Sequence, residues 1–371
     1  MHSSLIRTRG ILSSPQDAEV IYQQKKCYSF CSNDYLGLAN HPDIIKAAKR
    51  AADHYGVGSG ASHLITGHSD CHHLLEEELA EFIGAPRALL FSTGYMANLG
   101  VITTLMQKAD GIFADRLSHA SLLDASLASK AKLQRFLHNN PLSLKQQLEN
   151  SEAKQKMIVT EGVFSMDGDI APAPELLNIA KHQQAKLFID EAHTIGVLGK
   201  HGRGSLEHHN IKYSDDMILM GTLGKAFGSF GAFVAGSESV IESLIQGARP
   251  YIYTTALPPM IAAAARAGLQ LIKNETWRRE HLNELITYFK TEAANLGLQL
   301  APSITPIQPL LIGDSEKALE ISHALLEQGI LVKAIRPPTV PPNTARLRIT
   351  FSANHTIEHV TKLLEGLKRV C

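Results

Sequence analysis

The sequence predicts an α/β fold with a mostly parallel sheet and helices on both faces of that sheet. Two observations support this prediction. Short apolar runs such as Met217-Ile-Leu-Met220 have the length and composition of strands that are buried on both faces. These runs alternate along the chain with longer segments of helical pattern, which is the order expected of parallel strands joined by crossover helices.

The composition is that of a globular protein whose partners are small molecules. The 371 residues are 44% hydrophobic, and a chain of this length buries roughly three quarters of its unfolded surface. Lys plus Arg and Asp plus Glu number 36 each, which argues against a nucleic-acid or anionic-membrane surface. The four cysteines include no Cys-x-x-Cys pair, and no apolar run is long enough for a signal peptide or a spanning helix. We therefore expect a cytoplasmic protein.

The pattern of elements predicts three regions. Residues 1–40 are expected to form a basic, partly helical arm and a short hairpin around 25–30. Residues 41–246 have the alternating pattern and form a large α/β domain. Residues 247–371 are expected to form a smaller α+β domain. In this domain a long helical region follows Pro258-Pro259 and runs through Leu296. Its later elements are strands at 309–312, 329–335 and 345–351 and a final helix at 356–369.

A lysine follows one of the apolar runs directly. In Gly221-Thr-Leu-Gly-Lys225, the lysine stands at the carboxyl end of a predicted strand, where open α/β sheets bind their ligands. Burial there would lower the pKa of its amine, so Lys225 is the candidate Schiff-base lysine. A phosphate-binding P-loop would need a glycine at position 219 and a hydroxyl residue after the lysine. Leu219 and Ala226 occupy these positions, which excludes a P-loop.

A second predicted strand ends in an acid and a histidine. Lys186-Leu-Phe-Ile-Asp190 is followed three residues later by His193. Enzymes that use pyridoxal 5'-phosphate (PLP) need a carboxylate against the pyridine nitrogen, because it keeps that nitrogen protonated and the ring an electron sink. Asp190 fits this role, and His193 can reach the phenolic oxygen or the face of the ring. Together with Lys225, these residues predict PLP as the cofactor.

The motifs resemble those of the α-oxoamine synthases, a family within the fold-type I (aspartate aminotransferase-like) PLP enzymes. The resemblance runs from about Ser32 to the last helix and rests on five motifs in the family's order: Ser32-Asn-Asp-Tyr-Leu-Gly-Leu38, Asp115-Arg-Leu-Ser-His-Ala-Ser121, Thr160-Glu-Gly-Val-Phe-Ser-Met-Asp-Gly-Asp169, Asp190-Glu-Ala-His193 and Gly221-Thr-Leu-Gly-Lys225. It implies a mostly parallel seven-stranded sheet and a homodimer with shared active sites.

Further residues are expected to hold the cofactor. Its phosphate belongs at the start of a helix predicted at 96–106, where backbone N–H groups and the helix dipole favour an anion. Gly94 allows the backbone to approach, Tyr95 adds a side-chain contact, and Thr222 can donate its hydroxyl to the phosphate. The resemblance adds three residues, namely His119 stacked on the ring as a third catalytic residue beside Lys225 and Asp190, Ser165 near the cofactor, and Thr255 against the phosphate bound by the partner subunit.

The resemblance also implies the reaction and its substrates. It indicates a decarboxylating condensation of L-alanine with a pimeloyl thioester, carried by coenzyme A or by an acyl-carrier protein. The implied substrate contacts are Arg7 with the acyl carboxylate, Asn33 and His119 with the substrate, Thr339 in a proline-stiffened loop, and Arg348 with the carboxylate of the amino acid. Siblings that use glycine or serine share the same core. A non-catalytic binding subunit is the alternative from another class, and the presence of all the catalytic residues argues against it.

Two other motifs lead to weaker hypotheses. Gly56-Val-Gly-Ser-Gly-Ala-Ser-His63 looks like a dinucleotide fingerprint, but His63 occupies the place of the last glycine and no convincing strand precedes it. The resemblance places this loop near the dimer interface, where it helps to complete the neighbouring active site. His68, Cys71, His72 and His73 could be zinc ligands, but they are nearly contiguous and an amphipathic helix follows, so we predict no metal site.

Overall fold

The computed structural model describes residues 9–371, so Arg7 lies outside the described residues. By its packing the chain divides into two compact units. One, here called the sheet unit, comprises Pro42–Phe164 and Ile170–Asn274; the other, the terminal unit, comprises Met1–His41, Ser165–Asp169 and Glu275–Cys371. The domain limits at residues 40 and 246 stay a prediction.

The sheet unit is built on a seven-stranded sheet in the order β3-β9-β8-β7-β6-β4-β5. β9 runs antiparallel to both of its neighbours, and the other strands run parallel to one another. The mostly parallel seven-stranded sheet is therefore confirmed. Its strands are β3 (Arg87–Phe91), β4 (Gly111–Asp115), β5 (Lys132–Phe136), β6 (Lys156–Glu161), β7 (Lys186–Asp190), β8 (Met217–Thr222) and β9 (Ala232–Gly236).

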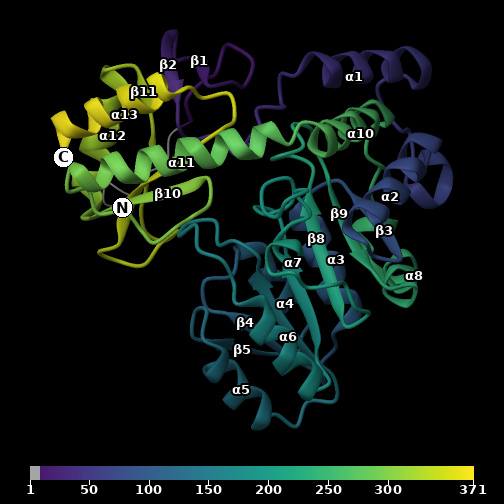
Figure 1. The fold of residues 1–371 in the computed structure, drawn as a ribbon. Helices are drawn as coiled ribbons and strands as arrows, with labels where there is room; N and C mark the ends of the chain where they lie inside the picture. Colours follow the sequence, from purple (N-terminus) through teal and green to yellow (C-terminus); the bar gives the residue numbers. More distant parts are fainter. Residues whose placement is uncertain (1–8) are drawn as a thin grey trace. The chain divides into compact units, whose positions relative to one another are not determined.

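Both faces of this sheet are covered. Val159 and Met220 face an apolar cluster that includes residues of α3, α4 and α8, and the alternate residues Ile158 and Leu219 are buried as well. This two-sided burial explains why the strands are continuous apolar runs in the sequence. Figure 1 shows α3, α4, α6 and α8 beside these strands. The helices of this unit are α1 (Pro42–Tyr55), the π-helical η2 (His63–Gly67), α2 (Asp70–Ile83), α3 (Gly94–Leu105), α4 (Ala120–Ala128), α5 (Pro141–Glu149), α6 (Ala173–His182), α7 (Ser205–His208), α8 (Glu238–Gly247), α9 (Arg249–Ile252) and α10 (Pro259–Asn274).

The parallel strands bring their carboxyl ends to one edge of the sheet. β6 ends at Glu161, β7 at Asp190 and β8 at Thr222, so the polar residues that follow the apolar runs gather at this edge. α3 begins there too, two residues earlier than predicted. Thr93 is its N-cap, and the side chain of Thr93 accepts a hydrogen bond from the backbone N–H of Met96 at 3.1 Å.

The terminal unit contains two three-stranded sheets, β1-β2-β11 and β10-β13-β12. A hairpin is present as β1 and β2, but it begins at residue 19, so the range predicted for it, around 25–30, covers only its second strand. Residues 9–18 of the predicted partly helical arm form no helix. The predicted strand at 329–335 is two strands, because β11 pairs with β2 whereas β12 pairs with β13. The elements are β1 (Glu19–Tyr22), β2 (Lys25–Ser29), α11 (Trp277–Asn295), β10 (Ile307–Gly313), α12 (Ser315–Glu327), β11 (Ile330–Leu331), β12 (Lys333–Ile335), β13 (Ala345–Thr350) and α13 (Ile357–Val370).

Helix α10 supports the loop that contains Lys225. A Cβ atom added to Gly268 of α10 would lie 2.5 Å from the carbonyl oxygen of Phe227, which is two residues beyond the lysine. Helix and loop can approach this closely only because position 268 has no side chain.

Among residues 9–371, no helix is long and apolar enough to cross a membrane.

We expect Gly268→Ala to destabilise the protein. In an open helix this change stabilises by about 0.5–1 kcal/mol, but overpacking costs about 1–3 kcal/mol, so the free energy of unfolding should fall. Urea denaturation measures this change. Gly58→Ala is the control, because nothing lies within 4 Å of a Cβ atom at that position. A Gly268→Ala protein as stable as the wild type would contradict the close packing of α10 on the loop.

Candidate active site

A cavity of ≈ 240 Å³ lies at the carboxyl edge of the large sheet. Its walls come from the start of α3, the segment that joins β4 to α4, and the ends of β6, β7 and β8. The lining residues are Gly94, Tyr95, Asn98, His119, Ser121, Glu161, Asp190, Ala192, His193, Met220, Thr222 and Lys225. The structure therefore brings together seven of the predicted cofactor residues in one place, namely Gly94, Tyr95, His119, Asp190, His193, Thr222 and Lys225.

The amine of Lys225 is held by a histidine. Its Nζ lies 2.8 Å from Nε2 of His193, and the imidazole is buried. This contact fixes where the lysine amine sits in the cavity.

The carboxylate of Asp190 is buried and is held by neutral donors. Its side chain accepts hydrogen bonds from the backbone N–H of Ala192 at 3.0 Å and from Nδ2 of Asn98 at 2.9 Å. Only 5% of Asp190 is exposed, and among residues 9–371 no cationic side chain pairs with it. A buried carboxylate is costly unless a positive group joins it, so this arrangement suits a ligand with a cationic N–H.

A hydrogen-bond chain connects Asp190 to His119. Nδ2 of Asn98 donates to Oγ of Ser121 at 2.9 Å as well as to Asp190, and Ser121 Oγ lies 2.7 Å from Nδ1 of His119. The backbone N–H of Ser121 donates to the same Nδ1 at 3.2 Å. Because this nitrogen accepts, the neutral imidazole carries its hydrogen on Nε2. Glu161 fixes the backbone here, since its Oε1 accepts from the N–H of His119 at 2.6 Å.

The start of α3, which lines the cavity, suits an anion. The first N–H groups of α3 have no partner within the helix and point toward its amino end. The hydroxyl of Tyr95 donates to Oδ2 of Asp124 at 2.6 Å, and this hydrogen bond raises the pKa of the phenol. The hydroxyl of Thr222 donates to the carbonyl oxygen of Gly231 at 3.1 Å. A Cβ at Gly94 would only touch Met220 at 3.4 Å, so packing alone does not require glycine there.

The remaining predicted residues lie outside this cavity lining. Ser165, Asn33, Thr339 and Arg348 belong to the terminal unit. Within that unit, Arg348 donates from Nε to the carbonyl oxygen of Ser165 at 2.6 Å and from Nη1 to Oδ1 of Asn33 at 3.1 Å. Thr255 is an exposed residue of the sheet unit. The predicted roles of these residues stay predictions.

A model of the aminotransferase class I and II family matches residues 25–367. The chain belongs to this family. The family model and the relatives below confirm the resemblance to α-oxoamine synthases and the fold-type I architecture.

Relatives within the aminotransferase class I and II family are similar over nearly their whole length. The 8-amino-7-oxononanoate synthase of Cellvibrio japonicus is 57% identical over 364 residues, which are 98% of this chain and 92% of that protein. The solved 8-amino-7-oxononanoate synthase of Francisella tularensis is 37% identical with a TM-score of 0.81, over 92% of this chain and 97% of that chain. A serine palmitoyltransferase of S. paucimobilis with bound PLP and myriocin is 31% identical with a TM-score of 0.94, over 98% of this chain and 92% of that chain.

Two of the cavity-lining residues that were not predicted from the sequence connect residues that were. Asn98 and Ser121 connect Asp190 to His119, yet neither was predicted as a site residue. Asn98 follows Gly94 by four residues and therefore shares its face of α3. Ser121 ends the motif that contains His119. In both cases the position was visible in the sequence, but the hydrogen-bond partner was not.

We expect Asn98→Ala to destabilise the protein, because the buried carboxylate of Asp190 loses a donor. Hydrogen bonds to charged groups contribute about 1.5–3 kcal/mol, and the free energy of unfolding should fall by a similar amount, measured by denaturant titration. Asn150→Ala is the control, since the exposed Asn150 makes only a local bond to the carbonyl oxygen of Gln146. Equal effects of the two substitutions would rule out a special role for Asn98.

Proposed function

We propose that this chain is an 8-amino-7-oxononanoate synthase of biotin biosynthesis. It condenses L-alanine with a pimeloyl thioester and releases 8-amino-7-oxononanoate, carbon dioxide and a free thiol, with PLP as the cofactor. The observation that supports this most is the placement of the Lys225 amine and the buried Asp190 carboxylate in one cavity. The 57% identity to the enzyme of Cellvibrio japonicus supports the choice of substrates.

The residues of the cavity fit PLP. Asp190 offers a buried anion that pairs with no cationic side chain among residues 9–371. Lys225 offers an amine. The start of α3 offers N–H groups to a phosphate. When bound, PLP supplies an aldehyde that reacts with amines and a ring that takes up an electron pair from the amino acid. The carboxylate of Asp190 would hold a proton on the ring nitrogen, and the amine of Lys225 would hold the cofactor through its aldehyde and move the proton of the alanine Cα.

Histidines position these groups. His193 holds the Nζ atom of Lys225 at 2.8 Å and so keeps the amine in the cavity. The hydrogen-bond chain through Ser121 and Asn98 sets the ring of His119 and leaves its Nε2–H for a hydrogen bond to the substrate or the cofactor. A positioned acid or base of this kind contributes about 10²–10⁴-fold to the rate.

Arg348 is the proposed clamp for the carboxylate of alanine. The residue is 7% exposed, and its guanidinium donates to the neutral oxygens of Ser165 and Asn33. Among residues 9–371 no carboxylate pairs with it. Arg346, two residues earlier on β13, instead donates from Nη1 to Asp167 at 2.6 Å. A buried guanidinium without an anion is suited to bind one.

The other predicted contacts complete the proposal. Asn33, Thr339 and Arg7 contact the substrate, and Ser165 lies near the cofactor. Thr255 reaches the phosphate in the partner subunit of a homodimer. The cytoplasmic location stays a prediction.

A second candidate uses serine in place of alanine. The TM-score of 0.94 to a serine palmitoyltransferase favours it, although the identity is only 31%. The two candidates share the same catalytic residues and differ in the amino acid and the acyl thioester that they take.

The test of the proposed function is a substrate comparison. We expect the purified protein with PLP and pimeloyl-coenzyme A to form 8-amino-7-oxononanoate with alanine, with lower kcat/KM for glycine and serine, measured by mass spectrometry. Lys225→Ala should lower kcat by at least about 10²–10⁴-fold, because the reacting amine is lost. A parallel assay with pimeloyl-acyl-carrier protein as the donor shows whether the enzyme takes the acyl group from coenzyme A or from the carrier protein. Preference for serine would move the chain to the second candidate, and full turnover by Lys225→Ala would exclude the mechanism.

We expect Arg348→Lys to raise KM for alanine, because a lysine cannot form the two parallel hydrogen bonds of a guanidinium. The loss of a charged hydrogen bond predicts an increase of about 10- to 100-fold. Steady-state kinetics measures it. Arg346→Lys is the matched control, since Arg346 is equally buried and already pairs with Asp167. An equal change of KM for alanine in both variants would contradict the role of Arg348 as the clamp for the alanine carboxylate.

A further inference from the structure

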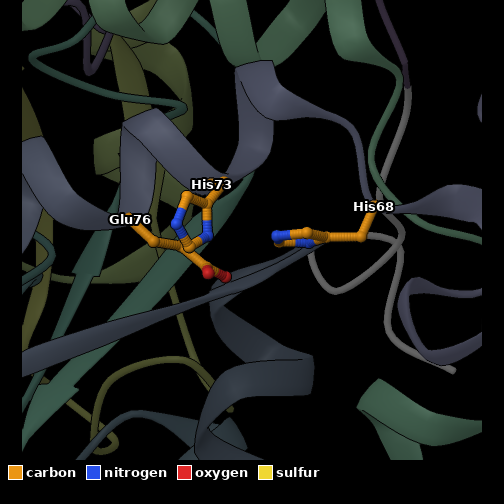
Figure 2. Close-up of side chains that lie close together, drawn as sticks. All are labelled: His68, His73 and Glu76. Carbon is orange, nitrogen blue, oxygen red and sulfur yellow. The ribbon is translucent and has the colours of Figure 1, made fainter.

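Four histidines gather around the start of α2, outside the cavity lining described above. They are His63, His68, His72 and His73, and the rings of His68 and His73 are 6.0 Å apart between centroids. Glu76 of the same helix lies beside them. Figure 2 shows the ring of His68 extending toward the side chains of His73 and Glu76. Donor atoms of these three residues all lie within 4.8 Å of one another.

The helix selects which of the neighbouring residues can act together. His73 and Glu76 are three residues apart on α2 and therefore share a face, while His68 comes from the segment just before the helix. Cys71 is 7% exposed and His72 is fully buried. His72 also uses both ring nitrogens, accepting from the N–H of Ser69 at 3.0 Å and donating to the carbonyl oxygen of Leu257. The contiguous set considered from the sequence is therefore replaced by His68, His73 and Glu76.

Two further contacts orient this group. Oε1 of Glu76 accepts from the backbone N–H of Leu90 at 2.8 Å, which fixes the carboxylate. Nδ1 of His68 lies 2.9 Å from Nδ1 of His63, so one of these two nitrogens must carry a hydrogen. When Nδ1 of His68 carries it, Nε2 of His68 has a lone pair for a ligand. Such outer contacts hold metal ligands in place in known sites.

The charge of the group suits a cation. Glu76 brings one carboxylate to the two imidazoles of His68 and His73, and its side chain is only partly exposed. A divalent ion would offset the cost of a carboxylate charge in this position.

We propose that His68, His73 and Glu76 bind one divalent transition-metal ion, of which zinc is the best match. Two imidazoles and one carboxylate are a ligand set that Zn²⁺ takes with tetrahedral geometry, and water fills the fourth position. The ion would connect α2 to the end of η2. The preceding glycine-rich segment is tied to the chain beside Thr255, because Oγ of Ser59 donates to the carbonyl oxygen of Leu257 at 2.6 Å. None of the three ligands lines the cavity described above, so the role of the ion would be structural.

The test is metal binding by the full-length protein with its cofactor. The protein is treated with a chelator, desalted, and titrated with ZnCl₂ by calorimetry and with Co²⁺ by visible absorption. We expect one Zn²⁺ per chain, a tetrahedral Co²⁺ spectrum, and a melting temperature that rises with Zn²⁺. His73→Gln and Glu76→Gln should each weaken Zn²⁺ binding by at least about tenfold, the effect known even for residues that only orient the ligands.

Matched controls separate this site from binding elsewhere. Glu81→Gln changes an exposed acid of the same helix, and His182→Gln changes a histidine of α6; both should bind Zn²⁺ as the wild type does. Both test variants should fold, because the side chain of His73 is 64% exposed and the amide oxygen introduced by Glu76→Gln can still accept from Leu90. If one of the two variants does not fold, the Zn²⁺ affinity of the other decides the test. Wild-type protein that binds no Zn²⁺, or equal affinity in His73→Gln and the controls, would overturn the proposal.

Discussion

The structure depends most on one buried charge, the carboxylate of Asp190. Only 5% of this residue is exposed, and its partners are the amide of Asn98 and a backbone N–H. Neutral donors lower the cost of burying a carboxylate but do not neutralise it. The site is therefore complete only when a cationic group faces Asp190. A protonated pyridine nitrogen would be such a group, and Lys225 lines the same cavity, where its amine would hold the same cofactor through its aldehyde.

The two buried arginines of β13 show the same principle with the opposite sign. Arg346 is paired with Asp167 and so serves the fold of the terminal unit. Arg348 is held by the oxygens of Ser165 and Asn33, which orient the guanidinium without cancelling its charge. The difference lies in the partner and not in the residue type. For this reason the partners of a buried charged side chain are a better indicator of its function than its residue type.

The sequence predicted the parts of the site that depend on strand ends. Lys225 and Asp190 directly follow apolar runs, and parallel strands bring such ends to one edge. Asn98 could not be predicted in this way, because it precedes Asp190 by 92 residues and meets it only through the packing of α3. The split of the strand at 329–335 also depends on distant partners, since β11 pairs with β2 and β12 with β13. The histidine cluster was visible, but helical geometry brings Glu76 into it and leaves Cys71 and His72 in the core.

Similarity of fold and similarity of sequence favour different substrates here. The TM-score is higher to a serine palmitoyltransferase, 0.94 against 0.81, whereas identity is higher to the 8-amino-7-oxononanoate synthases. Fold similarity reports the backbone, and one backbone can serve several related reactions. The choice between alanine, glycine and serine depends on a methyl or hydroxyl group, and a pocket discriminates a single methylene by only about 1–3 kcal/mol. A few side chains determine a difference of that size. Sequence identity samples those side chains, and the TM-score does not, so the identity is the stronger guide to the substrate.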